Sequence, residues 1–306
     1  MSTSRKPEAD RFKGTSKWFQ YIFARVLVTL IQCLPLGFAF RLGRGIGYIC
    51  WKLLKRRRLV VERNLTIINQ WNPQVSDLPI AEQVREVFQR SGANLIAGFP
   101  LSKLSSTRME QHLEVQGSEH LKNLISEGKG AIMLLAHMGP WEALAHLPKL
   151  AEAREIHAPL ASMYRPLNNT YLDDWLRKER EAMGTRLFSR RDGFHKPVDF
   201  LKQGGVLGIL ADQKMREGAV ASYFGVDVPS SPIPGLFQRR TGAGFLALSI
   251  ETVAPVKWRI TINPVDLAAL EGEVTREAYT AVCNHALEQV LSRSILDGFW
   301  FHKRFM

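Results

Sequence analysis

The chain has 306 residues and a formal net charge of +12, from 41 Lys and Arg against 29 Asp and Glu. Its hydrophobic content of 45% excludes a disordered chain, and its mean hydropathy of −0.11 excludes a polytopic membrane protein. Three cysteines, none in a C-x-x-C pair, exclude a disulfide framework and a zinc ribbon. The positive charge is concentrated in the N-terminal segment. Residues 1–63 hold 14 Lys and Arg against 3 Asp and Glu, whereas residues 64–306 hold 27 against 26.

The first predicted element is an apolar segment at residues 18–40, which follows a basic N-terminus. Its charge-free part, residues 26–40, has 15 residues, whereas a helix that spans a bilayer needs about 20. Arg25 can snorkel to the headgroups, and the basic run at residues 55–58 attracts anionic lipids. Residues 1–63 are therefore predicted to be a membrane-anchoring helical segment, either a tilted span or an in-plane helix, with the body on the cytoplasmic side.

Two alternatives stay open for this segment. A cleaved signal peptide also has a basic start and an apolar middle, but no small-x-small cleavage site follows, since the segment ends in Gly-Phe-Ala-Phe before Arg41. A buried helix followed by a solvated basic helix fits the pattern as well.

Beyond residue 63, apolar runs of strand length alternate with helical patterns. This alternation predicts one α/β domain over residues 64–306, with a central mixed, largely parallel sheet flanked by helices. The predicted strands are residues 130–136, 159–164, 206–211, 220–224, 245–250 and 256–262. The predicted helices are residues 81–97, 119–127, 141–153, 170–183, 196–203 and 276–296.

The most informative stretch begins where the predicted strand at residues 130–136 ends, directly before His137. Gly139 and Pro140 then open a predicted helix with Glu142 in its first turn. Ligands of open α/β sheets bind at the carboxyl ends of strands. A neutral imidazole can take a proton from an alcohol, and a carboxylate on its other nitrogen fixes the tautomer. The N–H groups at the start of the helix favour an oxyanion or a phosphate.

No serine or cysteine nucleophile lies near His137, and the chain has no G-x-S-x-G elbow. This favours direct attack of a substrate hydroxyl on an acyl carbonyl, without an acyl-enzyme. A structural histidine with a capping glutamate stays open as the alternative. Glu142 and His146 are four residues apart on one predicted helix face, but the H-E-x-x-H spacing is absent, so no metal site is predicted.

The segment from His137 to Glu142 resembles the H-x4-D/E motif of glycerolipid-type acyltransferases. Its Trp-Glu ending resembles the lauroyl/myristoyl acyltransferases of lipid A biosynthesis, within the lysophospholipid acyltransferase-like superfamily. Further blocks of that family follow in order: Tyr164-Arg165-Pro166-Leu-Asn168 resembles Y-R-P-x-x-N, residues 201–213 with Asp212-Gln213 resemble L-K-x-G-G…D-Q, and residues 300–305 resemble W-x-H-R-R-F. Pro140, Thr170 and Lys303 depart from the family pattern and bear on the substrate more than on the reaction.

The resemblance implies an O-acyltransferase that moves a fatty acyl chain from acyl-acyl carrier protein to a hydroxyl of a lipid A precursor. It implies the cell inner membrane, with the catalytic domain on the cytoplasmic side, and neither cofactor nor metal. His137 is the implied general base and Glu142 its orienter. The resemblance also implies four substrate-binding residues, Tyr164, Arg165, Asn168 and Asp212. Arg165 suits a phosphate of the acceptor or of the donor phosphopantetheine, and Asp212 suits a cation such as Arg165.

One close alternative stays open, and two more distant functions are disfavoured. A related acyltransferase would use a phospholipid or glycolipid acceptor with acyl-CoA. A nucleic-acid partner is not predicted, because the excess charge flanks an apolar segment rather than forming a groove. A dinucleotide site at residues 43–47, Gly-Arg-Gly-Ile-Gly, has no preceding strand, so these glycines are predicted to be small residues in a packed helix. The acyl chain length would depend on the depth of an apolar slot.

Overall fold

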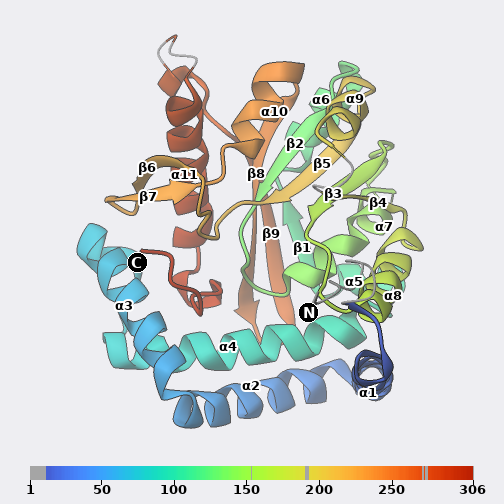
Figure 1. The fold of residues 1–306 in the computed structure, drawn as a ribbon, viewed down its shortest axis with the longest axis vertical. Helices are drawn as coiled ribbons and strands as arrows, with labels where there is room; N and C mark the ends of the chain where they lie inside the picture. Colours follow the sequence, from blue (N-terminus) through green and yellow to red (C-terminus); the bar gives the residue numbers. More distant parts are fainter. Residues whose placement is uncertain (1–11, 153, 190–192, 271, 273–274, 306) are drawn as a thin grey trace, which may run out of the picture.

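A computed structural model describes residues 12–152, 154–189, 193–270, 272 and 275–305 (Figure 1). Within these residues the main sheet has seven strands, in the order β1-β9-β8-β2-β5-β3-β4, and every neighbouring pair is parallel except β8 with β9. The predicted fold class, an α/β domain with a central, largely parallel sheet flanked by helices, is confirmed. The strands are β1 (Leu113–Gln116), β2 (Ala131–Leu135), β3 (Leu160–Tyr164), β4 (Thr185–Ser189), β5 (Val206–Leu210), β8 (Gly244–Ala254) and β9 (Lys257–Pro264).

The predicted strand at residues 220–224 lies outside the main sheet. It forms β6 (Ala219–Tyr223), which pairs in antiparallel fashion with β7 (Val226–Ser230). Phe224 and Gly225 connect the two strands, and both have positive φ, as the tight hairpin turn between right-twisted strands requires. The turn at Phe224 and Gly225 therefore pairs β6 with β7 rather than with a strand of the main sheet.

Two of the predicted helices are divided in the structure. Residues 141–153 form a short 3-10 helix, η3 (Trp141–His146), and then α7 (Leu147–Glu152). Because η3 is short, few peptide dipoles align at the helix N-terminus that was predicted to favour an anion beside His137. Residues 276–296 form α11 (Arg276–Ser292) and then η6 (Ile295–Asp297). The other helices of the body are α4 (Ile80–Leu101), α5 (Ser106–Glu110), α6 (Ser118–Ser126), α8 (Thr170–Glu181), α9 (His195–Lys202) and α10 (Ile233–Thr241), with the short turns η2 (Pro73–Val75) and η5 (Ala268–Leu270).

The apolar segment at residues 18–40 is not one helix but parts of two, α1 (Thr15–Gln32) and α2 (Leu36–Leu53). Pro35 separates them, because a proline fits directly before a helix but breaks a helix interior. In the described part of the chain, no helix combines the length and the apolar character that crossing a membrane requires. The predicted boundary at residue 63 falls inside α3 (Lys55–Trp71), and residues 1–11 lie outside the described residues.

Helices α2 and α4 lie side by side across the edge of the sheet at which β2 and β8 end (Figure 1). Their backbones touch at Gly43, Gly47 and Gly92, where an added Cβ would collide with a carbonyl oxygen of the facing helix. The prediction that the glycines of residues 43–47 serve helix packing is confirmed for Gly43 and Gly47, whereas Gly45 is exposed and an added Cβ there has no heavy atom within 4 Å. Together α4 and α2 form a two-helix layer beneath the edge that carries His137.

Candidate active site

His137 directly follows β2, and Asp212 lies just beyond β5, the strand that pairs with β2. Because the two parallel strands end at the same edge, the side chains meet, and His137 Nδ1 lies 2.7 Å from Asp212 Oδ1. The Asp212 carboxylate is buried, whereas the His137 ring borders a cavity. Since an ionised carboxylate only accepts hydrogen bonds, Nδ1 carries the proton, and Nε2 keeps its lone pair.

Opposing effects set the pKa values of this pair. Burial lowers the pKa of His137, but the charge and hydrogen bond of Asp212, assisted by the charge of Glu142, outweigh burial and raise that pKa above its ordinary value. Burial raises the pKa of Asp212, yet the interactions with His137 and the charge of His302 outweigh it and lower that pKa. Asp212 therefore stays ionised, and it makes the His137 ring a stronger base.

Glu142 lies in the first turn of η3, but its carboxylate faces α8. Glu142 Oε2 is 2.7 Å from Arg180 Nη2 in an ion pair that is partly exposed. The hydrogen bond to His137 Nδ1 predicted for Glu142 is made by Asp212 instead, because β5 ends beside β2 whereas the η3 turn points toward α8. In this structure Glu142 acts on His137 through its charge. No group of three or more His, Cys, Asp and Glu side chains suited to a metal ion occurs among the described residues.

The backbone of the His137 loop is held by the C-terminal segment. Phe299 N donates to His137 O at 2.8 Å, and Gly139 N donates to Asp297 O at 3.0 Å. Gly139 has a φ of 54°, and a Cβ at this position would collide with the carbonyl oxygen of Ile250. The two hydrogen bonds and the close approach of Ile250 therefore fix the backbone conformation of the His137 loop between β8 and the C-terminal segment. In this conformation the imidazole faces Asp212.

Asp297 helps to position the His137 loop, although no motif in the sequence indicates this role. Its buried carboxylate accepts hydrogen bonds from Asn94 Nδ2 at 2.9 Å, Ser294 Oγ at 2.6 Å, and both the N and Oγ1 of Thr252, at 2.9 and 2.7 Å. Arg90 supplies a positive charge at 3.2 Å. The sequence signal for this role is an acidic residue within the apolar stretch at residues 295–301. An acidic residue in such a stretch is expected to be buried, and a buried carboxylate needs several hydrogen-bond donors.

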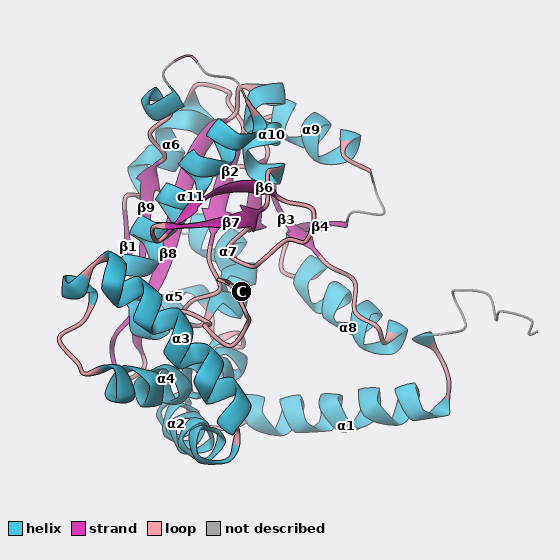
Figure 2. Cartoon of the chain, turned by 60° about the vertical axis from the view of Figure 1, so that its left-hand side comes forward, coloured by secondary structure: helices cyan, strands magenta, loops and turns pink. Residues whose placement is uncertain are grey.

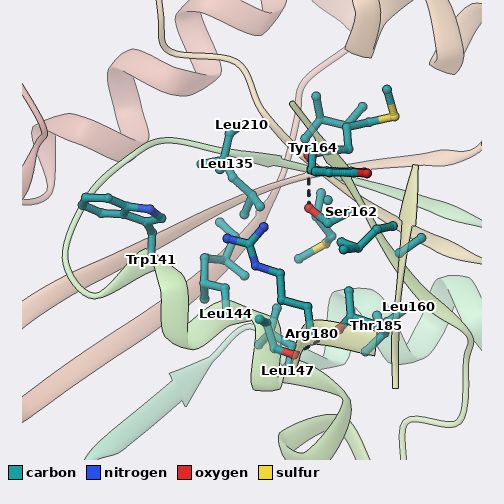
Figure 3. Close-up of a pocket in the computed structure, with 18 of the residues that line it drawn as sticks. Leu135, Trp141, Leu144, Leu147, Leu160, Ser162, Tyr164, Arg180, Thr185 and Leu210 are labelled. Atoms are coloured by element: carbon teal, nitrogen blue, oxygen red, sulfur yellow. Dashed lines mark hydrogen bonds between the residues drawn. The ribbon is translucent and has the colours of Figure 1, made fainter. Parts of the chain in front are cut away.

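A cavity of about 1290 Å³ lies beside His137. Apolar side chains from the strands of the main sheet and from η3 and α7 line most of it, and Figure 3 shows Trp141, Leu144 and Leu147 across from Tyr164 and Leu210. The side chain of Arg180 reaches in among them (Figure 3). The volume is above the usual range of about 300–1,000 Å³ for ligand pockets, so the cavity has room for a long apolar ligand.

The structure brings the remaining predicted site residues to this cavity. Tyr164 ends β3, and Arg165 and Asn168 follow it in the loop before α8, where all three line the cavity together with His137. Asp212 contacts the His137 ring rather than Arg165. Asn169, the neighbour of Asn168, caps α8 through its Oδ1 and donates to Lys17 O at 2.9 Å, so it ties α8 to α1.

Comparison with known proteins adds to this geometry. The family described as bacterial lipid A biosynthesis acyltransferase matches residues 5–306. The lipid A biosynthesis lauroyltransferase of Escherichia coli (strain K12) is 22% identical over 292 residues, which make up 94% of this chain and 91% of that protein. The family match includes the His137 loop, the residues that line the cavity, and the C-terminal segment that holds the loop.

Proposed function

Because the chain belongs to the family of bacterial lipid A biosynthesis acyltransferases, we propose that it transfers a fatty acyl chain from acyl-acyl carrier protein to a hydroxyl of a lipid A precursor. As a member of this family the chain is an O-acyltransferase. The observation that carries the proposal is the His137–Asp212 pair beside a large cavity with apolar walls. The pair supplies a base for the hydroxyl, and the cavity supplies a place for the chain.

In the proposed reaction, His137 Nε2 takes the proton of the acceptor hydroxyl while Nδ1–H donates to Asp212. The hydroxyl oxygen attacks the thioester carbonyl, so that a C–O bond forms and the C–S bond breaks. The imidazolium then returns the proton to the leaving thiolate. The ionised Asp212 stabilises the imidazolium between these steps, which is the effect that raises the pKa of His137. No acyl-enzyme is formed.

Four basic or polar side chains have proposed roles around this reaction. Arg180 holds the Glu142 carboxylate on the cavity side of η3, where its charge favours the imidazolium. Arg165, with its planar guanidinium, binds a phosphate of the acceptor or of the donor. Asn168 and Tyr164 complete the substrate contacts on the same wall.

We further propose that α1 and α2 lie in the plane of the inner membrane, with the body on the cytoplasmic side. Both helices expose large apolar side chains, which suits an in-plane helix better than a span. The basic start of α3 and Lys52 at the end of α2 would meet anionic headgroups. The exposed apolar residues are Trp18, Phe19, Phe23, Val26, Leu27 and Leu30 on α1, and Phe38, Leu42, Ile46, Tyr48, Ile49 and Leu53 on α2.

The function is tested by incubating the purified chain with acyl-acyl carrier protein and a lipid A precursor and following the product by mass spectrometry. We expect one added acyl chain per acceptor, and a loss of about 10²–10⁴-fold in rate for His137→Ala. His157→Ala, which alters an exposed histidine, is the matched control. Faster transfer from acyl-CoA to a phospholipid would replace the proposed donor and acceptor, and full activity of His137→Ala would refute the mechanism.

A further inference from the structure

One wall of the cavity is formed by strands in the middle of the sheet. A parallel sheet in an α/β domain is normally covered on both faces, and β2 follows this rule, with every residue buried. In β5, however, Gly208 and Leu210 are only half-buried while the residues beside them are buried, and in β3 Leu160 and Ser162 are half-buried too. All four residues border the cavity. The open part of the sheet is therefore the surface of β5 and β3.

Gly208 lies at the centre of this open surface. It is in register with Met133 on β2 and with Ser162 on β3, and both of these residues also line the cavity. A glycine inside a strand weakens the strand, because it has no side chain to pack and loses more backbone entropy on folding. The structure must therefore contain a reason for a glycine at this position.

Neither backbone conformation nor a collision with neighbouring backbone supplies that reason. The φ of Gly208 lies outside the left-handed region, and an added Cβ would meet the end of the Leu135 side chain, Cδ1, at 3.2 Å, with Ala161 O at 3.7 Å and Ser162 Oγ at 3.9 Å. By contrast, a Cβ at Gly130 would collide with the carbonyl oxygen of Leu201, and a Cβ at Gly205 with the ring of Phe200. What glycine provides at position 208 is space in the cavity wall.

We propose that Gly208 is a specificity-determining residue: the transferred acyl chain crosses the sheet over this glycine, which admits long chains. The proposal rests on the proposed function and specifies the path of the acyl chain in it. Gly208 lies on β5, four residues before Asp212, which follows the end of that strand, and at about 3.3 Å per extended residue this places Gly208 about 13 Å from the reacting end of the site. A side chain at this depth meets the far part of a long chain and leaves a short chain untouched.

The test measures kcat/KM of the full chain for octanoyl, lauroyl and palmitoyl donors with one lipid A precursor. For Gly208→Ala and Gly208→Val we expect unchanged octanoyl transfer and a palmitoyl kcat/KM that falls by at least about tenfold, with the larger loss for valine. Gly98→Ala in α4 is the matched control, because it adds the same methyl where no heavy atom lies within 4 Å. An equal loss for all three donors, or no loss for palmitoyl, would overturn the proposal.

A second measurement does not depend on acyl transfer. Calorimetry with octanoate and palmitate compares the binding of the two fatty acids to the unaltered chain and to Gly208→Val, and circular dichroism checks that the variant is folded. Weaker palmitate binding in Gly208→Val supports the chain path even if the unaltered protein transfers no acyl group, in which case the proposed function alone fails. Equal palmitate affinities in the two folded proteins contradict the chain path.

Discussion

At the residue scale, the site depends on which carboxylate reaches which nitrogen. Asp212 is buried and contacts His137 Nδ1, whereas Glu142 is partly exposed and contacts Arg180. A buried carboxylate acts strongly on its neighbour, because little water screens its charge, and a partly exposed carboxylate acts weakly. The two carboxylates are therefore expected to differ in their effects on the basicity of His137.

Asp212→Asn is expected to lower kcat/KM by roughly 10²–10⁴-fold, because the amide can donate to Nδ1 and favour the wrong tautomer. The sign of the pH effect follows from the raised pKa of His137. His137 acts as a base only when neutral, so activity is lost as the pH falls through its pKa. Without the Asp212 charge, burial lowers this pKa, and the acid limb of the kcat/KM profile moves to lower pH. Asp227→Asn, at an exposed position on β7, should change neither quantity.

Glu142→Gln is expected to move the acid limb in the same direction but by less, since the charge of Glu142 raises the pKa of His137 less than Asp212 does. The pH profile of kcat/KM, recorded alongside that of Asp212→Asn, measures both shifts. An activity loss as large as that of His137→Ala, with no shift of the acid limb, would show that Glu142 takes part in the chemistry directly.

At the element scale, the glycines of α2 determine how closely it packs on α4. An added Cβ at Gly47 would collide with the backbone of α4 at Phe88, whereas an added Cβ at Gly45 has no heavy atom within 4 Å. The two glycines are two residues apart in the same helix, so they point to different sides of it. One faces the partner helix, and the other is exposed.

Gly47→Ala should therefore lower the free energy of unfolding by about 1–3 kcal/mol, through overpacking against α4. Gly45→Ala should raise it by up to about 1 kcal/mol, because alanine has the better helix propensity. Denaturant titration followed by circular dichroism gives both values. Changes of the same sign in the two variants would contradict the packing of α2 on α4.

At the scale of the whole molecule, the apolar surface of α1 and α2 and the edge of the sheet that carries His137 lie at the same end. Figure 2 shows α1 extending along this end beside α2 and α4, with α8 above it. Asn169 and Lys17 join α1 to α8, which borders the cavity through Arg180. A membrane bound to α1 and α2 would thus lie close to the route by which a lipid reaches His137.

The double variant Phe23→Glu, Leu27→Glu should weaken binding to phosphatidylglycerol vesicles by at least about tenfold, since two large apolar side chains no longer enter the bilayer. Co-sedimentation with the vesicles measures the binding. Val220→Glu changes an exposed apolar residue on β6 and serves as the control. Equal sedimentation of the double variant and the unaltered chain would exclude α1 as the membrane contact.

The sequence by itself determined several of the strands and helices and the chemistry of the candidate base. Buried apolar runs predict β2 and β5 within a residue or two, and the position of His137 directly after a strand predicts a ligand site, because these signals depend on local periodicity. Strands β1, β4 and β7 were not predicted, because their sequences LEVQ, TRLFS and VDVPS contain no continuous apolar run like those of β2 and β5. The ordered motifs indicated the family, which the match over residues 5–306 confirms.

Only the tertiary structure decided which side chains meet. Glu142 is five residues from His137 in sequence, and Asp212 is 75 residues away, yet Asp212 makes the hydrogen bond because β5 pairs with β2. Asp297 reaches the same loop for a similar reason, since the C-terminal segment crosses the strand ends. The apolar segment at residues 18–40 was visible in the sequence, but only the fold placed its helices α1 and α2 at the end of the molecule that carries His137. Local pattern sets secondary structure, whereas strand order and chain crossing set the partners of each functional group.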